Sequence, residues 1–375
     1  MEQPREDREL EAPTHLPQHD LSTTRSRLEA LPQLQPAPST AKSYARSWQR
    51  FLAWCDERGC EALPAEPINV VSYIIEAGTR SDGAGRPAAY NTISGWVAAI
   101  NKAHEMQRLP RPGDSLEVKT ALGRLRATLP PARRTPVLSV TDLRRILDDI
   151  NVDQHPQAVH GARDSAIILI AFSGAFQRSQ VAALRYRDIG IDHEEGLLVT
   201  VREGPKVQGV KLLKYAQDPR MCPVCAFIRW AMVHNAIRLE QTTATVQTVL
   251  DGFQKDQHCC VVASDPALYE RRTNTIADQP RRRPVFQPIS TIGRLYESAP
   301  HHPKGISTQV VNDVVKKHAQ AVGLHAEGVG AHSLRASYIN RALQEGGSIE
   351  DVMRQSWLRS PTYASNFLWP ERSWW

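Results

Sequence analysis

Two side chains that can bind a phosphate group lie three positions apart in the segment Ala331-His332-Ser333-Leu334-Arg335. In a helix, residues at this spacing lie on the same face, one turn apart. An imidazole and a guanidinium in that arrangement can hold a phosphodiester between two hydrogen-bond donors. Because many helices carry a histidine and an arginine at this spacing, the meaning of the pair depends on the elements that position it.

The length and the charge of the chain limit its possible functions. The chain has 375 residues and a net charge of +6. This length exceeds that of a single hydrophobic core, so we expect two domains, and the positive charge favours an anionic partner. The sequence has no apolar run long enough to cross a bilayer, and its N-terminus lacks the apolar core of a signal peptide. We therefore expect no membrane association and a cytoplasmic location.

The six cysteines do not have the spacing of a disulfide framework, and a chain of this size does not need one. Cys222-Pro223-Val224-Cys225 is a CxxC motif, which can bind zinc when a second pair of ligands is present. His258, Cys259 and Cys260 could supply that pair, although their spacing is unusual. The simpler interpretation is a turn followed by an apolar helix, and we predict neither a metal site nor a cofactor.

The N-terminal third of the chain has two parts. Residues 1–38 are polar and rich in Pro, Glu, Gln and Arg, a composition typical of disordered segments. Residues 39–130 have the apolar periodicity of four helices, the first of which is expected to be capped at Ser39-Thr40. Basic residues, including Arg124 and Arg126, alternate with the apolar residues of the fourth helix. This region is predicted to be a small all-helical domain with one basic side.

A stiff basic linker, residues 131–137, follows and contains Arg133 and Arg134. Most segments of the next region, residues 138–367, have helical periodicity. Residues 197–202 and 210–215 alternate as strands do, with a turn at Gly204-Pro205-Lys206 between them. Residues 240–283 fit neither pattern. The predicted fold class is α+β, mostly α with a small β-sheet.

Four segments, in this order, resemble motifs of the tyrosine recombinase (phage integrase) family. They are residues 174–189 (GAFQRSQVAALRYRDI), the turn with Lys206, the segment His332-Ser333-Leu334-Arg335, and residues 353–367. Residues 39–59 resemble the start of the family's helical core-binding domain. The resemblance covers roughly residues 39–369. It implies a core-binding (SAM-like) DNA-binding domain at 39–130 and a tyrosine-recombinase-like catalytic domain at 138–367.

The family's reaction gives each motif a role. In the family, a tyrosine hydroxyl attacks a DNA phosphodiester, and no metal takes part. Two arginines stabilise the charge on the phosphate, and a histidine and a lysine assist proton transfer. The resemblance places Lys206, His332 and Arg335 at three of these catalytic positions, and at all three the residue type is retained.

Three other positions depart from the family pattern. Gln177 stands where the family has its first arginine, and an amide cannot replace a bidentate guanidinium. Arg178, about 100° further around a helix, is interpreted as a surface or DNA-backbone residue. Leu358 stands at the His or Trp position, although a one-residue shift could bring the neighbouring Trp357 to the phosphate. Phe367 stands at the nucleophile position and has no hydroxyl group.

Tyr363 is the alternative nucleophile. It lies one helical turn before Phe367, on roughly the same face but about 6 Å away along the helix axis. Catalysis does not tolerate a displacement of this size unless the helix is rearranged. The simpler role for Tyr363 is packing or a hydrogen bond to a phosphate.

We therefore predict a DNA-binding protein of this family that cannot cleave DNA. It would act as a structural or regulatory component in DNA recombination or in integration of a mobile element. The resemblance implies that the two domains close as a C-shaped clamp on double-stranded DNA. The residues expected to contact the DNA backbone are Arg124, Arg126, Arg133 and Arg134.

Two alternative functions remain open. The first is an active site-specific recombinase that uses Tyr363. The second is an assembly subunit that pairs with itself or with active recombinases through the aromatic C-terminal tail, residues 368–375. Trp369, Trp374 and Trp375 favour docking of this tail in a pocket, which could belong to a neighbouring subunit or to its own domain.

Overall fold

The computed structural model of the protein describes residues 38–79, 87–130, 135–239, 241–260, 266–296, 303–324, 328–358 and 360–361. The chain divides into two compact units, Met1–Arg133 and Arg134–Trp375. Their boundary falls inside the segment predicted as a linker, of which residues 131–134 lie outside the described part. Residues 1–37, predicted to be disordered, also lie outside it. Pro38 was included in that disordered segment, but it is the first residue of a helix.

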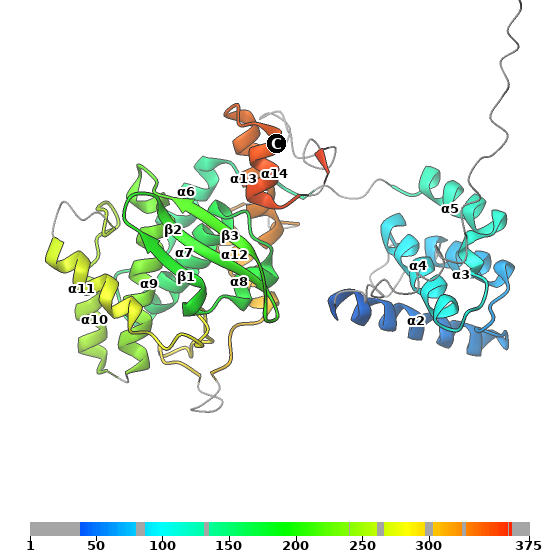
Figure 1. Ribbon diagram of the computed structural model, residues 1–375, viewed down its shortest axis with the longest axis horizontal. Helices are drawn as coiled ribbons and strands as arrows, with labels where there is room; N and C mark the ends of the chain where they lie inside the picture. Colours follow the sequence, from blue (N-terminus) through cyan, green and yellow to red (C-terminus); the bar gives the residue numbers. More distant parts are fainter. Residues whose placement is uncertain are drawn as a thin grey trace, which may run out of the picture. The chain divides into compact units, whose positions relative to one another are not determined.

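The N-terminal unit is helical, as its apolar periodicity predicts. Its described α-helices are α2 (Pro38–Arg58), α3 (Pro67–Thr79), α4 (Tyr90–Met106) and α5 (Leu116–Thr128), coloured blue to cyan in Figure 1. Ser115 caps α5 by accepting a hydrogen bond from the N–H of Val118 at 3.3 Å. The helices bury one hydrophobic cluster, in which Phe51, Val70, Ile74 and Ile100 are fully buried.

The larger unit is built around a buried helix, α7 (Gln157–Ser173), in which every residue from Gly161 to Phe172 is buried. A helix that is buried on all sides belongs in the middle of a core. Six further helices of this unit are α6 (Val140–Asp149), α8 (Arg178–Ala183), α9 (Pro223–Arg238), α12 (Thr308–Ala321), α13 (Ala331–Gln344) and α14 (Ile349–Ser356). In the described part of the chain, no helix has the length and apolar character that crossing a membrane requires.

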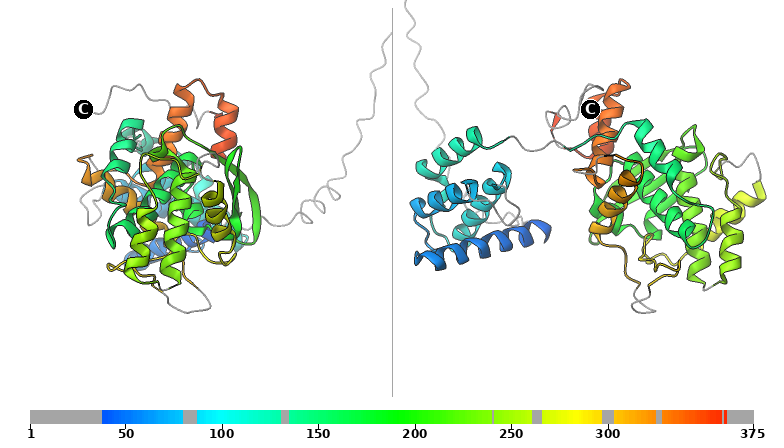
Figure 2. Two further views of the ribbon diagram at one scale, coloured as in Figure 1. Left: turned by 90° about the vertical axis from the view of Figure 1, so that its left-hand side faces the viewer. Right: turned by 180° about the vertical axis from the view of Figure 1, so that it is seen from behind.

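A three-stranded antiparallel sheet lies on one side of α7 and α9 (Figure 1), and the view from behind shows the helices in front of it (Figure 2). Its order is β1 (Ile189–Asp192), β2 (Gly196–Glu203) and β3 (Lys206–Lys214). The sequence predicted β2 and most of β3 but missed β1. Lys206, predicted in the turn, is the first residue of β3 and pairs with Glu203. This sheet and the predominance of helices confirm the predicted fold class.

Residues 240–283, which fitted no sequence pattern, contain α10 (Thr243–Asp251) and α11 (Pro266–Ala277), both in contact with α9. The chain then returns beside the first motif. The N–H of Tyr186 donates to the carbonyl of Arg283 at 3.1 Å, and the N–H of Val285 donates to the carbonyl of Leu184 at 2.9 Å. This segment is therefore tied to the backbone that follows α8.

Candidate functional site

The first motif begins with a tight turn between α7 and α8. Ala175 has a φ of 46°, in the left-handed region, at a cost of about 1 kcal/mol for a residue with a Cβ. The turn is closed by a hydrogen bond from the N–H of Phe176 to the carbonyl of Ala171 at 2.9 Å. A Cβ at Gly174 would lie 2.3 Å from the Phe176 ring, so the turn needs glycine there. The carbonyls of Gly174 and Ala175 bind side chains from two other elements.

Arg335 reaches this turn from α13. Its side chain is 5% exposed, and its Nη1 donates to the carbonyl of Ala175 at 2.5 Å, which fixes the direction of the guanidinium. His332 lies one turn earlier on the same helix and reaches the surface. Partial burial of its ring and the charge of Arg335 both lower the pKa of His332. Both effects therefore favour the neutral form of the His332 ring.

Lys211 is a second buried cation at the same turn, and the sequence analysis missed it. Its Nζ donates to the carbonyl of Gly174 at 2.7 Å and lies 4.7 Å from the ring centre of Phe176. The side chain is 1% exposed, and burial, followed by the charge of Arg335, lowers the pKa of Lys211 to about 7. The available signal was strand alternation, because Lys211 and Leu213 occupy inward positions of β3.

Lys206 and Gln177 are not placed like Lys211. Lys206 is exposed at the end of the hairpin, five residues before Lys211, which corresponds to about 16 Å along a strand. Gln177 is exposed at the start of α8, where its backbone N–H donates to Oε1 of Gln180 at 2.8 Å. Arg178, the first residue of α8, is also exposed. Gln177 thus caps a short helix and adds no charge beside Arg335.

The end of α14 brings Trp357 to the site. Trp357 adopts a left-handed conformation after the helix, and its ring centre lies 4.8 Å from Nζ of Lys211. Gln355 fixes this end by donating from Nε2 to the carbonyls of Ser173 and Leu212. Leu358 instead packs in a small hydrophobic cluster formed by Ala336, Ile339 and Val352. The indole of Trp357, and not the side chain of Leu358, therefore lies against the site lysine.

Several predicted site residues lie outside the described part of the chain. Among these are Tyr363, Phe367 and the tail residues Trp369, Trp374 and Trp375. The same holds for Arg133 and Arg134. Arg124 and Arg126 are described, and both are exposed on α5 in the N-terminal unit. The Arg126 guanidinium lies 5.8 Å from the ring centre of Tyr90.

A separate cluster contains side chains that can bind a metal, although their unusual spacing in the sequence predicts no metal site. The ligand atoms of Cys222, Cys225, His258 and Cys260 lie within 4.8 Å of one another. The chain between the two pairs runs through the rest of α9 and through α10, and it brings the second pair back to the first. The fold therefore brings together four ligand side chains whose unusual spacing in the sequence argues against a metal site.

The pKa of Lys211 predicts an unusual dependence of stability on pH. In the unfolded chain a lysine stays protonated up to about pH 10.4, whereas in the folded chain Lys211 is neutral above about pH 7. Between these values the unfolded state binds more protons, so this group makes the free energy of unfolding rise with pH, by about 1.4 kcal/mol per unit. Lys211→Met should remove this rise, which urea unfolding from pH 7 to 10 would measure.

The matched control for this prediction is Lys214→Met, which changes an exposed lysine on the same strand. The difference in stability between Lys214→Met and wild type should not change over this pH range. The difference between Lys211→Met and wild type should favour the variant at pH 7 and shrink as the pH rises. A difference that is constant with pH would contradict the burial of a titrating lysine.

The relatives found by comparison with known proteins are recombinases and integrases. No family model matches the chain. The integrase/recombinase XerD homolog of Selenomonas ruminantium is 25% identical over 329 residues, which are 85% of this chain and 78% of the relative. The recombinase Cre of Escherichia phage P1 is 26% identical over 148 residues, or 39% of this chain and 40% of Cre.

A solved structure is similar in fold. It is the Tn1549 transposon integrase in complex with transposon right end DNA, with a TM-score of 0.52 and 14% sequence identity. The match covers 93% of this chain and 94% of the integrase chain. At this identity the similarity concerns the fold, in agreement with the helical unit and the α+β unit described above.

Proposed function

We propose that this chain, a member of the tyrosine recombinase and integrase family, binds double-stranded DNA. It would do so in recombination or integration, and it would not cleave the DNA. In this proposal the larger unit holds one phosphate of the DNA backbone at the turn after α7. The helical N-terminal unit adds further backbone contacts through its exposed arginines. The protein then acts as a structural or regulatory component and not as the subunit that cleaves the DNA.

The observation that carries this proposal is the cluster of basic side chains at the Gly174–Ala175 turn. Arg335 and Lys211 are bound to adjacent carbonyls of this turn, and His332 lies one helical turn from Arg335. Arg335 and the protonated form of Lys211 place positive charge at one turn, and this charge attracts an anion. The Tn1549 transposon integrase named above is in complex with DNA, and we infer that the anion here is a phosphate of the DNA backbone.

Support for the loss of cleavage comes from the positions around this cluster. Gln177 is exposed and uncharged where the resemblance calls for the first arginine. Leu358 fills a hydrophobic cluster, and Phe367, assigned from the sequence alone, has no hydroxyl. Binding of a phosphate needs only positive groups in fixed positions, whereas cleavage also needs a nucleophile and stabilisation of the charge that develops. The chain retains groups for the first task and lacks groups for the second.

A salt titration of DNA binding tests the proposal. The affinity of the full chain for a duplex should fall steeply with salt, because each neutralised phosphate releases a counterion. If six arginines (Arg124, Arg126, Arg133, Arg134, Arg178 and Arg335) each contact a phosphate, the slope of log affinity against log salt is about −5. Fluorescence anisotropy of a labelled duplex between 50 and 200 mM salt, roughly the range in which such slopes are compared, measures it.

Single substitutions make the test specific. Arg126→Gln should reduce the slope by about 1 and weaken binding to all sequences alike. Arg111→Gln is the control in the same unit, because Arg111 is already paired with Asp114 at 2.5 Å. Binding that is indifferent to salt, or the absence of binding to any duplex, would refute the proposal.

A further inference from the structure

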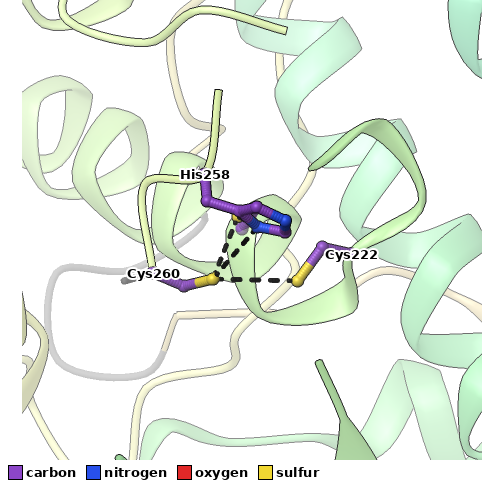
Figure 3. Close-up of side chains that lie close together, drawn as sticks. Cys222, His258 and Cys260 are labelled. Atoms are coloured by element: carbon purple, nitrogen blue, oxygen red, sulfur yellow. Dashed lines mark hydrogen bonds between the residues drawn. The ribbon is translucent and has the colours of Figure 1, made fainter. Parts of the chain in front are cut away.

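Four metal-ligand side chains converge at the start of α9, away from the turn that holds Arg335. Cys222 precedes the helix and Cys225 lies in its first turn, while His258 and Cys260 come from the loop after α10. Figure 3 shows the side chains of Cys222, His258 and Cys260 pointing toward one another. The three thiols are nearly fully buried, and the histidine is half-buried.

Three of the four separations given below match those of a single tetrahedral ion, and the fourth is shorter. With Zn–S bonds of about 2.3 Å and Zn–N bonds of about 2.05 Å, tetrahedral angles place two sulfurs about 3.8 Å apart and a sulfur and a nitrogen about 3.5 Å apart. The Sγ atoms of Cys222 and Cys260 are 3.8 Å apart, and those of Cys225 and Cys260 are 3.2 Å apart. Nδ1 of His258 lies 3.4 Å from Sγ of Cys225 and 3.5 Å from Sγ of Cys260.

The surroundings orient these ligands. Nε2 of His258 lies 3.1 Å from the carbonyl of Gln217, to which it can donate, and that bond leaves Nδ1 as the ligand atom facing the sulfurs. The N-terminus of α9 and the Arg272 guanidinium, bonded to the carbonyl of Cys259 at 3.1 Å, bring positive charge near the thiolates. Three thiolates with one divalent ion carry a charge of −1, which these groups offset.

The neighbouring Cys259 does not join the four ligand side chains. Cys259 is also buried and stands between two of the ligands in the sequence, yet its Sγ donates to the carbonyl of Cys225 at 3.5 Å. It does not belong to the group of four whose ligand atoms lie within 4.8 Å of one another. Proximity in the chain therefore does not explain the cluster, and Cys259 provides a matched control.

We propose that Cys222, Cys225, His258 and Cys260 bind one Zn²⁺ ion. Four protein ligands fill a tetrahedral shell, so the site is structural and leaves no position for a substrate. The ion joins the start of α9 to the loop that follows α10. It thereby anchors the segment 240–283, whose continuation is bonded to the backbone at Leu184 and Tyr186. This inference does not depend on whether the protein binds or cleaves DNA.

The metal content of the full chain, purified with reductant and without chelator, tests the proposal. We expect about one zinc per chain by mass spectrometry of the metal. Cys222→Ser and His258→Gln should each lose most of this zinc, and Cys259→Ser should retain it. His258 is the least buried of the four ligands, so His258→Gln keeps the test valid if a buried cysteine variant does not fold.

Cobalt provides a second measurement on the wild-type chain. Co²⁺ added to metal-free protein should give the visible absorption of a tetrahedral thiolate site and thiolate charge-transfer bands in the near ultraviolet. Cys259→Ser should give the same spectrum, and Cys222→Ser a weaker and shifted one. Failure to retain zinc or bind cobalt under reducing conditions would overturn the proposal. So would equal zinc loss in Cys259→Ser and Cys222→Ser, or a disulfide among the four positions that persists in reductant.

Discussion

The wild-type chain is expected to form no covalent adduct with a nicked duplex. A nick next to the scissile phosphate traps a tyrosine-linked intermediate, because the short cleaved strand diffuses away before it can religate. Phe367 offers no hydroxyl for this link, and Gln177 offers no charge to stabilise the phosphate. The substrate should be a duplex selected from a random pool by the chain itself, and adducts are measured as a shift on a denaturing gel.

Restoring the two missing groups should restore cleavage in a graded way. Phe367→Tyr alone restores the nucleophile, but the arginine that would stabilise the charge on the phosphate is still missing. Removal of one such donor costs about 10²–10³ in rate, so Gln177→Arg combined with Phe367→Tyr should react faster than Phe367→Tyr by roughly this factor. Leu358 is left unchanged in both variants because it fills a hydrophobic cluster, and Trp357 already lies against Lys211.

A different outcome would identify an active enzyme. An adduct formed by the wild-type chain and lost in Tyr363→Phe would show that Tyr363 is the nucleophile. That result would contradict the proposal of a non-cleaving protein. An absence of adduct with the double variant would contradict the assignment of positions 177 and 367, since the same selected duplex serves all the variants.

Chelation of the zinc proposed above should loosen one part of the larger unit. At a free zinc concentration about 1,000 times the dissociation constant, binding contributes about 4 kcal/mol to the folded state. Amides of α10 and of residues 252–260 should then exchange about 10³-fold faster after chelation, if their opening requires loss of the ion. Hydrogen exchange with mass spectrometry resolves this segment from the rest of the chain.

The controls for chelation use the same pair of cysteines. Cys259→Ser should respond to the chelator as the wild type does, whereas Cys222→Ser should exchange rapidly with or without it. Amides of α2 and α4 in the N-terminal unit should be unaffected in every case. A chelator effect spread evenly over both units, or an equal effect on Cys222→Ser, would show that the ion is not held at this cluster.

Part of the fold around the candidate site could be predicted from the sequence. The periodicity of its apolar residues was sufficient to predict most helices, because a helix face must be buried every three to four residues. The spacing of His332 and Arg335 was sufficient to place both on one helix. The segment 240–283 was not assigned from its sequence, although α10 and α11 form there and pack against α9.

Two features of the site were decided by contacts between distant segments. The role of Lys211 depends on the carbonyl of Gly174, 37 positions earlier, and no local pattern reports such a bond. The choice between Trp357 and Leu358 was open in the sequence, because adjacent residues differ only in the direction they face. The left-handed turn at Trp357 directs the indole to β3 and the leucine into the hydrophobic cluster.

By itself, the sequence determined the family motifs, the helical character, the retained His332 and Arg335, and the absence of charge at Gln177 and of a hydroxyl at Phe367. These properties belong to residue types and local spacing, so they need no coordinates. Only the tertiary structure decided that Lys211 is a buried partner of the Gly174–Ala175 turn and that Cys222, Cys225, His258 and Cys260 meet. Burial and metal coordination depend on distances between segments far apart in the chain, and folding alone sets those distances.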